Sequence, residues 1–397
     1  MVSISDTAMP RAAIAQTLPD PYNPPQRRWA KLPGGKPWGA SAGIEFGPYG
    51  ELWAIDRCGA NSCDGSGLPA VYQLDPRTGN VLKAIGAGLF AFPHGLHVDK
   101  DGNIWVTDPA IGKDGKTGRQ VVKLSPGGKV LMRLGMAGMA GGGAAMFSNP
   151  GDVITAPDGS IFVIDGHGTV EPNLPPDTIA RVIHVTKNGR FLKAWGSLGS
   201  GKGQFRNPHA VAFDSQGRLF VADRVNGRIQ VFAQDGTWLT EYRGFGAPSG
   251  LAITPDDTLY AVDYNTEGRK GIFIGNAGTG AVTGFVPDDQ ASEGIAAGPD
   301  GTLYEATPAG LTRFTRKNWK VPACPRRRWP PVSISRRAGG ESRRAAGFPG
   351  QNSGPPPPCP HRGMAAAIGW RGCGAGSGFH PAILPRGKAR GISAGTG

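Results

Sequence analysis

The sequence predicts an all-β fold, a six-bladed β-propeller, from three observations. A segment of 16 residues recurs six times between residues 41 and 307, and the copies align without a gap. Each copy contains two short apolar or alternating runs around a turn, which is typical of a pair of strands. The chain also has 64 glycines and 36 prolines in 397 residues, as expected for many short strands joined by tight turns.

Each repeat supplies the strands of one blade. The second run carries an aromatic residue at a fixed position, and two further strand-like runs, such as residues 120–126 and 129–135, follow the pair. Four strands per unit of roughly 40–50 residues favour a propeller over a solenoid. The aromatic positions, expected in the core between blades, are Trp53, Trp105, Phe162, Phe220, Tyr260 and Tyr304. We expect N-terminal residues near Trp29–Leu32 to close the ring by pairing with the last blade.

The predicted propeller covers residues 26–318, between a mostly irregular leader (1–25) and an Arg-, Pro- and Gly-rich tail (319–397). The tail is expected to be disordered. It carries 13 basic residues and one acidic residue, so it accounts for +12 of the net charge of +13. The body is nearly neutral, and nucleic acid is therefore not an expected partner. The tail is either an Arg-rich arm for an anionic partner or the product of a frameshift or a misplaced stop.

The sequence also bears on the cellular compartment. No apolar run approaches the roughly 18 residues of a transmembrane helix. Cys58 and Cys63 lie in a Gly/Asn loop, and their spacing favours a small disulfide of an oxidising compartment over a zinc pair or free thiols. The N-terminus as written lacks the apolar region of a signal peptide, although Ala13-Ile14-Ala15 has the small-x-small pattern of a cleavage site. The oligomeric state is not determined by these features.

One repeat position points to a metal site. Innermost strands line the channel of a propeller, so equivalent residues face one another around it. The second residue of each copy is small in blades one, three and five and of metal-ligand type in the other three: Ala42, His94, Gly151, His209, Ser249 and Glu293. Alternate blades are about 120° apart, so His94, His209 and Glu293 would converge on a divalent metal, either zinc or Fe(II). The alternative is a set of polar residues capping the channel mouth.

Residues just after the second strand should surround the same face. Arg57 and Arg224 suit a substrate that carries a carboxylate, through bidentate hydrogen bonds. His167 can act as an acid or base near neutral pH. Ordinary polar loop positions are the alternative for all three. His97 has no comparable support and is expected to be structural or exposed, and His184 falls in an outer strand.

These residues also carry a family resemblance. Residues 199–232 resemble an NHL repeat, and the stretches "IDRCG", "FPHGLHVDKDGNIWVTD", "VIDGHG" and "NPHAVAFD" resemble the peptidyl-α-hydroxyglycine α-amidating lyases, most closely their bacterial relatives. The resemblance spans about residues 26–318. It implies an exported NHL-type propeller with a channel zinc, and usually a structural calcium. The implied reaction cleaves a C-terminal α-hydroxyglycine to an amide and glyoxylate. The implied zinc ligands are His94 and His209, and the implied substrate-binding or catalytic arginines are Arg57 and Arg224.

Two positions depart from that family pattern. Where the family has a third histidine followed by a catalytic Asp, this sequence has Glu293 and Gly294, and His167 replaces the Tyr of a DGY motif. Glu293 can still ligate zinc. The predicted function is therefore a metal-dependent enzyme, lyase-like or next a hydrolase, with His167 as base, acting on a small molecule or peptide with a carboxylate. The alternative is a non-catalytic NHL-repeat module that binds a peptide, glycan or protein.

Overall fold

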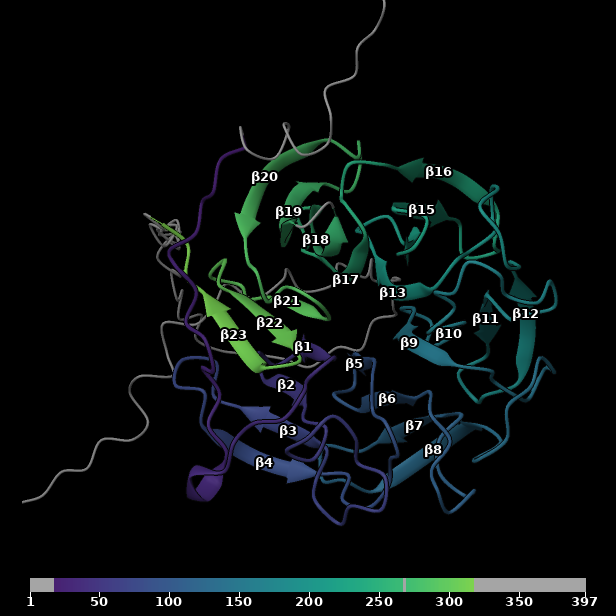
Figure 1. Ribbon diagram of the computed structural model, residues 1–397, viewed down its shortest axis with the longest axis horizontal. Helices are drawn as coiled ribbons and strands as arrows, with labels where there is room; N and C mark the ends of the chain where they lie inside the picture. Colours follow the sequence, from purple (N-terminus) through teal and green to yellow (C-terminus); the bar gives the residue numbers. More distant parts are fainter. Residues whose placement is uncertain (1–17, 267–268, 318–397) are drawn as a thin grey trace, which may run out of the picture. The chain divides into compact units, whose positions relative to one another are not determined.

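The computed structural model describes residues 18–266 and 269–317, which form six antiparallel sheets arranged around a central channel (Figure 1). This confirms the predicted six-bladed β-propeller. The chain divides into two units, Met1–Val321 and Pro322–Gly397, and the second unit lies outside the described residues. The tail, for which disorder is expected, therefore lies outside the described residues. The first 17 residues of the leader also lie outside them.

Each blade is a meander of consecutive strands that runs outward from the channel. In blades one to three the strands are β1 (Ile44–Phe46), β2 (Leu52–Ile55), β3 (Val71–Leu74), β4 (Val81–Ile85), β5 (Leu96–Val98), β6 (Ile104–Asp108), β7 (Gln120–Leu124), β8 (Val130–Gly135), β9 (Pro150–Thr155), β10 (Ile161–Asp165), β11 (Arg181–Val185) and β12 (Phe191–Trp195). A short 3-10 helix, η1 (Pro33–Gly35), precedes them.

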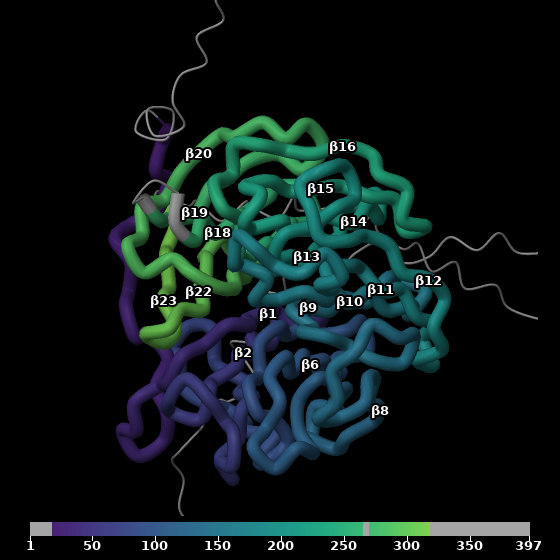
Figure 2. The backbone as a smooth tube through the Cα atoms, turned by 45° about the vertical axis from the view of Figure 1, so that its right-hand side comes forward, coloured from purple at the N-terminus to yellow at the C-terminus, as the bar shows by residue number. Residues whose placement is uncertain are grey.

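Blades four to six continue the ring in chain order (Figure 2). Their strands are β13 (Pro208–Phe213), β14 (Leu219–Asp223), β15 (Arg228–Phe232), β16 (Trp238–Tyr242), β17 (Pro248–Ile253), β18 (Thr258–Thr266), β19 (Arg269–Asn276), β20 (Val282–Pro287), β21 (Ile295–Ala297), β22 (Leu303–Thr307) and β23 (Gly310–Phe314). Among the described residues, no helix is long and apolar enough to cross a membrane.

The sixth sheet has three named strands, and an N-terminal segment pairs with its outer edge. The backbone N–H groups of Asn23, Gln26 and Trp29 donate to carbonyl groups of residues 315, 313 and 311, at 2.9, 2.8 and 2.9 Å. The ring closes through the N-terminus, as expected, but the pairing begins at Tyr22, ahead of the predicted segment. Lys31 instead pairs with Asn80 of blade one, so the chain has already crossed to the next blade at that point.

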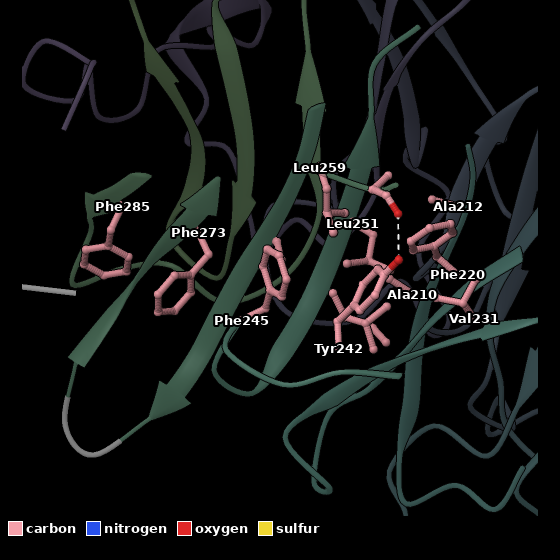
Figure 3. Close-up of a cluster of buried hydrophobic side chains, with 14 residues drawn as sticks. Ala210, Ala212, Phe220, Val231, Tyr242, Phe245, Leu251, Leu259, Phe273 and Phe285 are labelled. Carbon is pink, nitrogen blue, oxygen red and sulfur yellow. Dashed lines mark hydrogen bonds between the residues drawn. The ribbon is translucent and has the colours of Figure 1, made fainter. Parts of the chain in front are cut away.

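The core lies between neighbouring sheets, where the repeated aromatics are buried. Trp53, Trp105, Phe162 and Phe220 are at most 1% exposed. Figure 3 shows the cluster between blades four and five, where Phe220 and Tyr242 lie close to Leu251. The Tyr242 hydroxyl donates to the Ala277 carbonyl at 2.9 Å, which satisfies its polar end. Each large apolar side chain contributes about 1.5–3 kcal/mol of burial free energy.

In five of the six blades an Asp lies in or directly after the second strand, and this Asp has a structural role: Asp56, Asp108, Asp165, Asp223 and Asp263. Its carboxylate accepts backbone N–H groups from the segment that leads into the first strand of the same blade. Asp108 accepts from Ala91 at 3.0 Å and Phe92 at 2.6 Å, and Asp223 accepts from Arg206 at 2.7 Å. These bonds hold the start of the first strand beside the end of the second. The predicted metal ligands before or within the first strands therefore lie on the same face of the propeller as the predicted residues after the second strands, Arg57, His167 and Arg224.

Candidate metal centre

Three histidines from three consecutive blades converge at the channel. His94 precedes β5, His167 follows β10, and His209 is the second residue of β13. Their ligand nitrogens lie within 4.8 Å of one another. The ring centroids are 4.1 Å apart for His94 and His167, 4.9 Å for His94 and His209, and 5.1 Å for His167 and His209.

Glu293, at the start of blade six, reaches the same point. Its Oε2 atom lies 3.6 Å from Nε2 of His94 and 3.3 Å from Nε2 of His209. Ligands about 2.1 Å from a tetrahedral zinc are about 3.4 Å apart, so the two distances from Glu293 match the spacing of zinc ligands. All three atoms are buried and have no hydrogen-bond partner among the described residues. The donor set thus fits a divalent metal.

The backbone carbonyl groups of two small residues, Gly151 in blade three and Ser249 in blade five, orient the imidazoles. Nδ1 of His94 lies 2.8 Å from the Gly151 carbonyl, and Nδ1 of His209 lies 3.0 Å from the Ser249 carbonyl. A carbonyl oxygen can only accept, so each Nδ1 carries the proton and each Nε2 presents its lone pair to the centre. Metal-bound histidines are commonly oriented in this way. The alternating small positions are therefore part of the site.

His167 is closer to the predicted ligands than a peripheral acid or base would be. A Cβ atom at Gly151 would lie 3.4 Å from Cβ of His167, so the small residue in blade three leaves room for this ring. The sequence placed His167 near the metal face but did not indicate that it joins the histidine cluster. The signal that could have indicated it is Gly151, the small residue at the ligand position of blade three. His167, from the loop after β10 of the same blade, occupies the space that this glycine leaves.

The electrostatics of the cluster favour neutral imidazoles beside a carboxylate. Burial, together with the neighbouring histidines and arginines, holds the pKa of His167 and of His209 well below the usual 6.5. Burial would raise the pKa of Glu293, but the contact with His94 and the charges of Arg57 and Arg224 outweigh it and lower that pKa. Neutral imidazoles and an ionised carboxylate are the protonation states that bind a metal.

The two predicted arginines flank the cluster, each stacked on an aromatic ring. Arg57 is 4% exposed, and its guanidinium carbon lies 3.8 Å from the centroid of the Phe92 ring. The guanidinium carbon of Arg224 lies 4.4 Å from the centroid of the Tyr264 ring, and its Nη1 donates to Ser249 Oγ at 3.3 Å. Burial lowers the pKa of Arg57 to about 10, so this side chain still carries its charge at neutral pH.

His94, His209 and Glu293 line a channel cavity of about 260 Å³, and His97 also lines this cavity. His97 lies apart from the cluster, is 8% exposed, and bridges Glu45 and Thr155 through contacts of 3.0 and 2.8 Å. It is structural rather than exposed. His184 stacks on Phe162 in the third strand of blade three, at 4.0 Å between centroids. Neither residue joins the candidate metal centre.

Comparisons with known proteins define the class. The NHL repeat model matches residues 205–232, which span the first three strands of blade four. The fold resembles that of a gluconolactonase from Xanthomonas campestris, with a TM-score of 0.52 and 17% identity over 75% of this chain and 99% of that one. At this identity the likeness concerns the fold alone. The chain is thus a six-bladed β-propeller that carries an NHL repeat.

More specific similarity comes from amidating enzymes. The chain is 37% identical over 252 residues to peptidyl-glycine alpha-amidating monooxygenase B of Xenopus laevis, which covers 59% of this chain and 27% of that protein. It is 32% identical over 185 residues to peptidyl-alpha-hydroxyglycine alpha-amidating lyase 1 of Drosophila melanogaster, covering 43% of this chain and 31% of that protein. The matched region thus spans about a third or less of each of these relatives. The resemblance to the peptidyl-α-hydroxyglycine α-amidating lyases that the sequence indicated is thus confirmed.

Proposed function

We propose that this protein is a metal-dependent, lyase-like enzyme that cleaves the C–N bond of a peptide ending in α-hydroxyglycine. The observation that carries the proposal is the orphaned, buried set of His94 Nε2, His209 Nε2 and Glu293 Oε2 between two arginines. The similarity to amidating enzymes supports the reaction class. The fold by itself would not, since propellers carry many functions.

His94, His209 and Glu293 would hold zinc, which leaves one coordination position open for substrate. When bound, the metal polarises a substrate oxygen and lowers the pKa of a hydroxyl group. A fourth protein ligand would close the site, so we assign His167 to proton transfer. Because the pKa of His167 is held well below 6.5, the ring is neutral at pH 7 and able to accept a proton.

The residues of this chain account for the remaining steps. Arg57 and Arg224 bind the substrate carboxylate and orient the hydroxyl-bearing carbon toward the cluster. His167 accepts the hydroxyl proton, the carbonyl of glyoxylate forms, and the electron pair of the C–N bond passes to the nitrogen. The proton then moves from His167 to that nitrogen, which gives the peptide amide. Atoms and charge balance without a further reactant.

Export from the cytosol is part of the proposal. The Cys58–Cys63 disulfide is formed, as the sequence predicted, and such bonds persist in oxidising compartments.

The test is elemental analysis of the full-length protein beside a His94→Ala/His209→Ala double variant, followed by assay with an N-acyl-α-hydroxyglycine. We expect about one zinc per chain, lost in the variant, and release of glyoxylate that chelation abolishes and zinc restores. A folded parent that binds no metal after reconstitution with zinc would contradict the proposal, as would a variant that folds like the parent and keeps its zinc. The protein would then be an NHL-repeat binding module.

A further inference from the structure

The loop that follows Arg57 is closed by a disulfide and packed onto the segment that carries His94. Cys58 and Cys63 are bonded to each other, and Cys63 is 2% exposed within the core of blades one and two. The Cys63 N–H donates to the Ala91 carbonyl at 2.9 Å, and the Ser62 hydroxyl donates to the same oxygen at 3.2 Å. The disulfide loop is therefore fixed to the chain three residues before His94.

The same loop holds the guanidinium of Arg57. Asn61, which lies between the two cysteines, accepts a hydrogen bond from Arg57 Nη1 at 2.8 Å. Arg57 Nε donates to the carbonyl of Pro93 at 3.1 Å, and the Phe92 ring covers the guanidinium face. Asn61 itself is exposed. Its side chain is therefore positioned by the backbone of the disulfide loop rather than by burial.

Arg224 provides an internal comparison. It occupies the equivalent position in blade four, but the connection between β14 and β15 is only residues 224–227 and contains no cysteine. In blade one the connection between β2 and β3 covers residues 56–70. A longer connection has more conformations to lose, and a covalent cross-link restricts them. The disulfide thus restricts the connection of blade one, where blade four has a tight turn.

We propose that the Cys58–Cys63 disulfide positions Arg57 through Asn61 and makes carboxylate binding at the site redox-sensitive. This inference rests on the proposed function. A dithiol reagent is oxidised to its own disulfide while the Cys58–Cys63 bond breaks and two thiols form. The released loop no longer holds Asn61 against the guanidinium. Arg57 then has to be ordered by the substrate, which weakens binding without removing any ligand of the metal.

The experiment measures the Kd of the full-length protein for N-benzoylglycine, an unreactive carboxylate probe, before and after treatment with dithiothreitol. We expect about fivefold weaker binding on reduction, with unchanged metal content. Asn61→Ala should weaken binding similarly while the disulfide is intact. The Cys58→Ala/Cys63→Ala variant should bind like the reduced protein and show no response to dithiothreitol. Because the other three cysteines, Cys324, Cys359 and Cys373, remain in this variant, it also controls for effects of dithiothreitol on the tail.

Replacing each arginine separates positioning from general stability. The response to reduction should disappear in Arg57→Met and persist in Arg224→Met, because Arg57 hydrogen-bonds to the disulfide loop and Arg224 instead donates to Ser249. Equal binding by the oxidised and reduced parent, or an unaltered response in Arg57→Met, would overturn the inference.

Failure of the proposed function is distinguishable from failure of this inference. If the oxidised parent binds no probe, the proposed function fails. Hydrogen exchange of residues 57–66 and 91–94 still tests the positioning, and we expect exchange there to accelerate on reduction. Unchanged exchange would overturn it.

Discussion

Nδ1 of His94 donates to the Gly151 carbonyl of the next blade, 2.8 Å away. This bond sets the tautomer of the imidazole and turns Nε2 toward His209 and Glu293. His209 repeats the arrangement with Ser249, at 3.0 Å. A ligand position and the small position after it therefore form one unit, and the alternation of residue types around the channel has a physical cause.

The first prediction concerns the third ligand. We expect Glu293→Gln to lose zinc, because a neutral amide replaces the carboxylate that lies 3.3 Å from His209 Nε2. His167→Ala should retain zinc and lose glyoxylate release. Metal content measured after dialysis distinguishes the two, with His184→Ala as a control that retains zinc. The reverse result would make His167 the ligand and Glu293 the base.

The second prediction concerns the arginines. Arg57→Lys and Arg224→Lys should each lower kcat/KM by about 10- to 100-fold, mainly through KM, because lysine lacks the planar fork that binds a carboxylate. Arg243→Lys is the matched control, since its side chain is 49% exposed and pairs with Glu241. Steady-state kinetics with an N-acyl-α-hydroxyglycine checks this. An unchanged KM in both site variants would argue against carboxylate binding by these residues.

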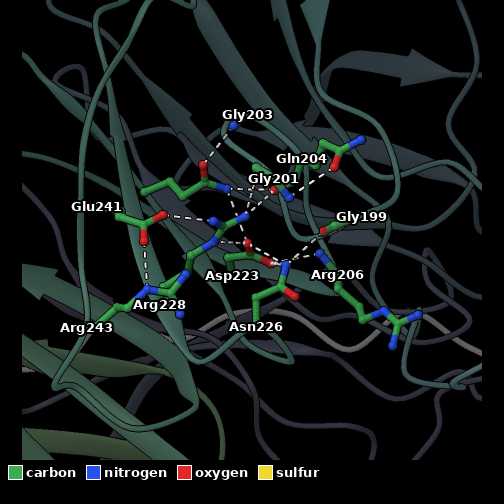
Figure 4. A network of polar contacts seen from close by, with 11 residues as sticks. Gly199, Gly201, Gly203, Gln204, Arg206, Asp223, Asn226, Arg228, Glu241 and Arg243 are labelled. Carbon is green, nitrogen blue, oxygen red and sulfur yellow. Dashed lines mark hydrogen bonds and ion pairs between the residues drawn. The ribbon is translucent and has the colours of Figure 1, made fainter.

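The third prediction concerns the buried network at Arg228 (Figure 4). Arg228 is 2% exposed and donates to Asp223 and to Glu241, both at 2.8 Å. Arg228→Met should lower the free energy of unfolding by about 3–5 kcal/mol, because Asp223 loses its cation in a buried setting. Urea unfolding monitored by tryptophan fluorescence gives the value. The amides of Asn226 and Gln230 also donate to Asp223, at 2.8 and 3.2 Å. A loss below about 1 kcal/mol would show that these two bonds suffice to hold the carboxylate.

The fourth prediction concerns pH. Burial raises the pKa of Asp152 to about 7. Burial would lower the pKa of His97, but Glu45 outweighs it and the net shift is upward. Both folded-state pKa values exceed the unfolded ones, so the stability they contribute is present at low pH and is lost as the pH rises through them. The contribution of these two groups to the free energy of unfolding should therefore fall between pH 5 and pH 8, and it opposes the rise that the lowered pKa values of His167 and His209 contribute over the same range.

Asp152→Asn tests this pH dependence. The change in the free energy of unfolding from pH 5 to pH 8 should become less negative in the variant than in the parent by on the order of 1 kcal/mol, since Asp152 no longer titrates. Asp101→Asn, at an exposed position of blade two, should keep the slope of the parent. A slope that does not change in Asp152→Asn would mean that other groups control the dependence.

Much of this architecture follows from the local sequence. The spacing of the six copies, their turns and their aromatics predict the blades, because strand alternation and tight turns are set by neighbouring residues. Pairing of the N-terminal segment with the last blade was predicted, but the residues that pair were not. The pairing of Gln26 with Arg313 joins residues far apart in the chain, and no local pattern specifies it.

The sequence by itself determined that His94, His209 and Glu293 occupy equivalent positions of alternate blades, since a repeat places equivalent residues around one axis. Only the tertiary structure decided that His167 enters the same cluster and that the disulfide loop reaches Arg57. Both depend on irregular connections whose paths are set by packing against the neighbouring blade. Periodicity carries no information about such paths, because they do not repeat.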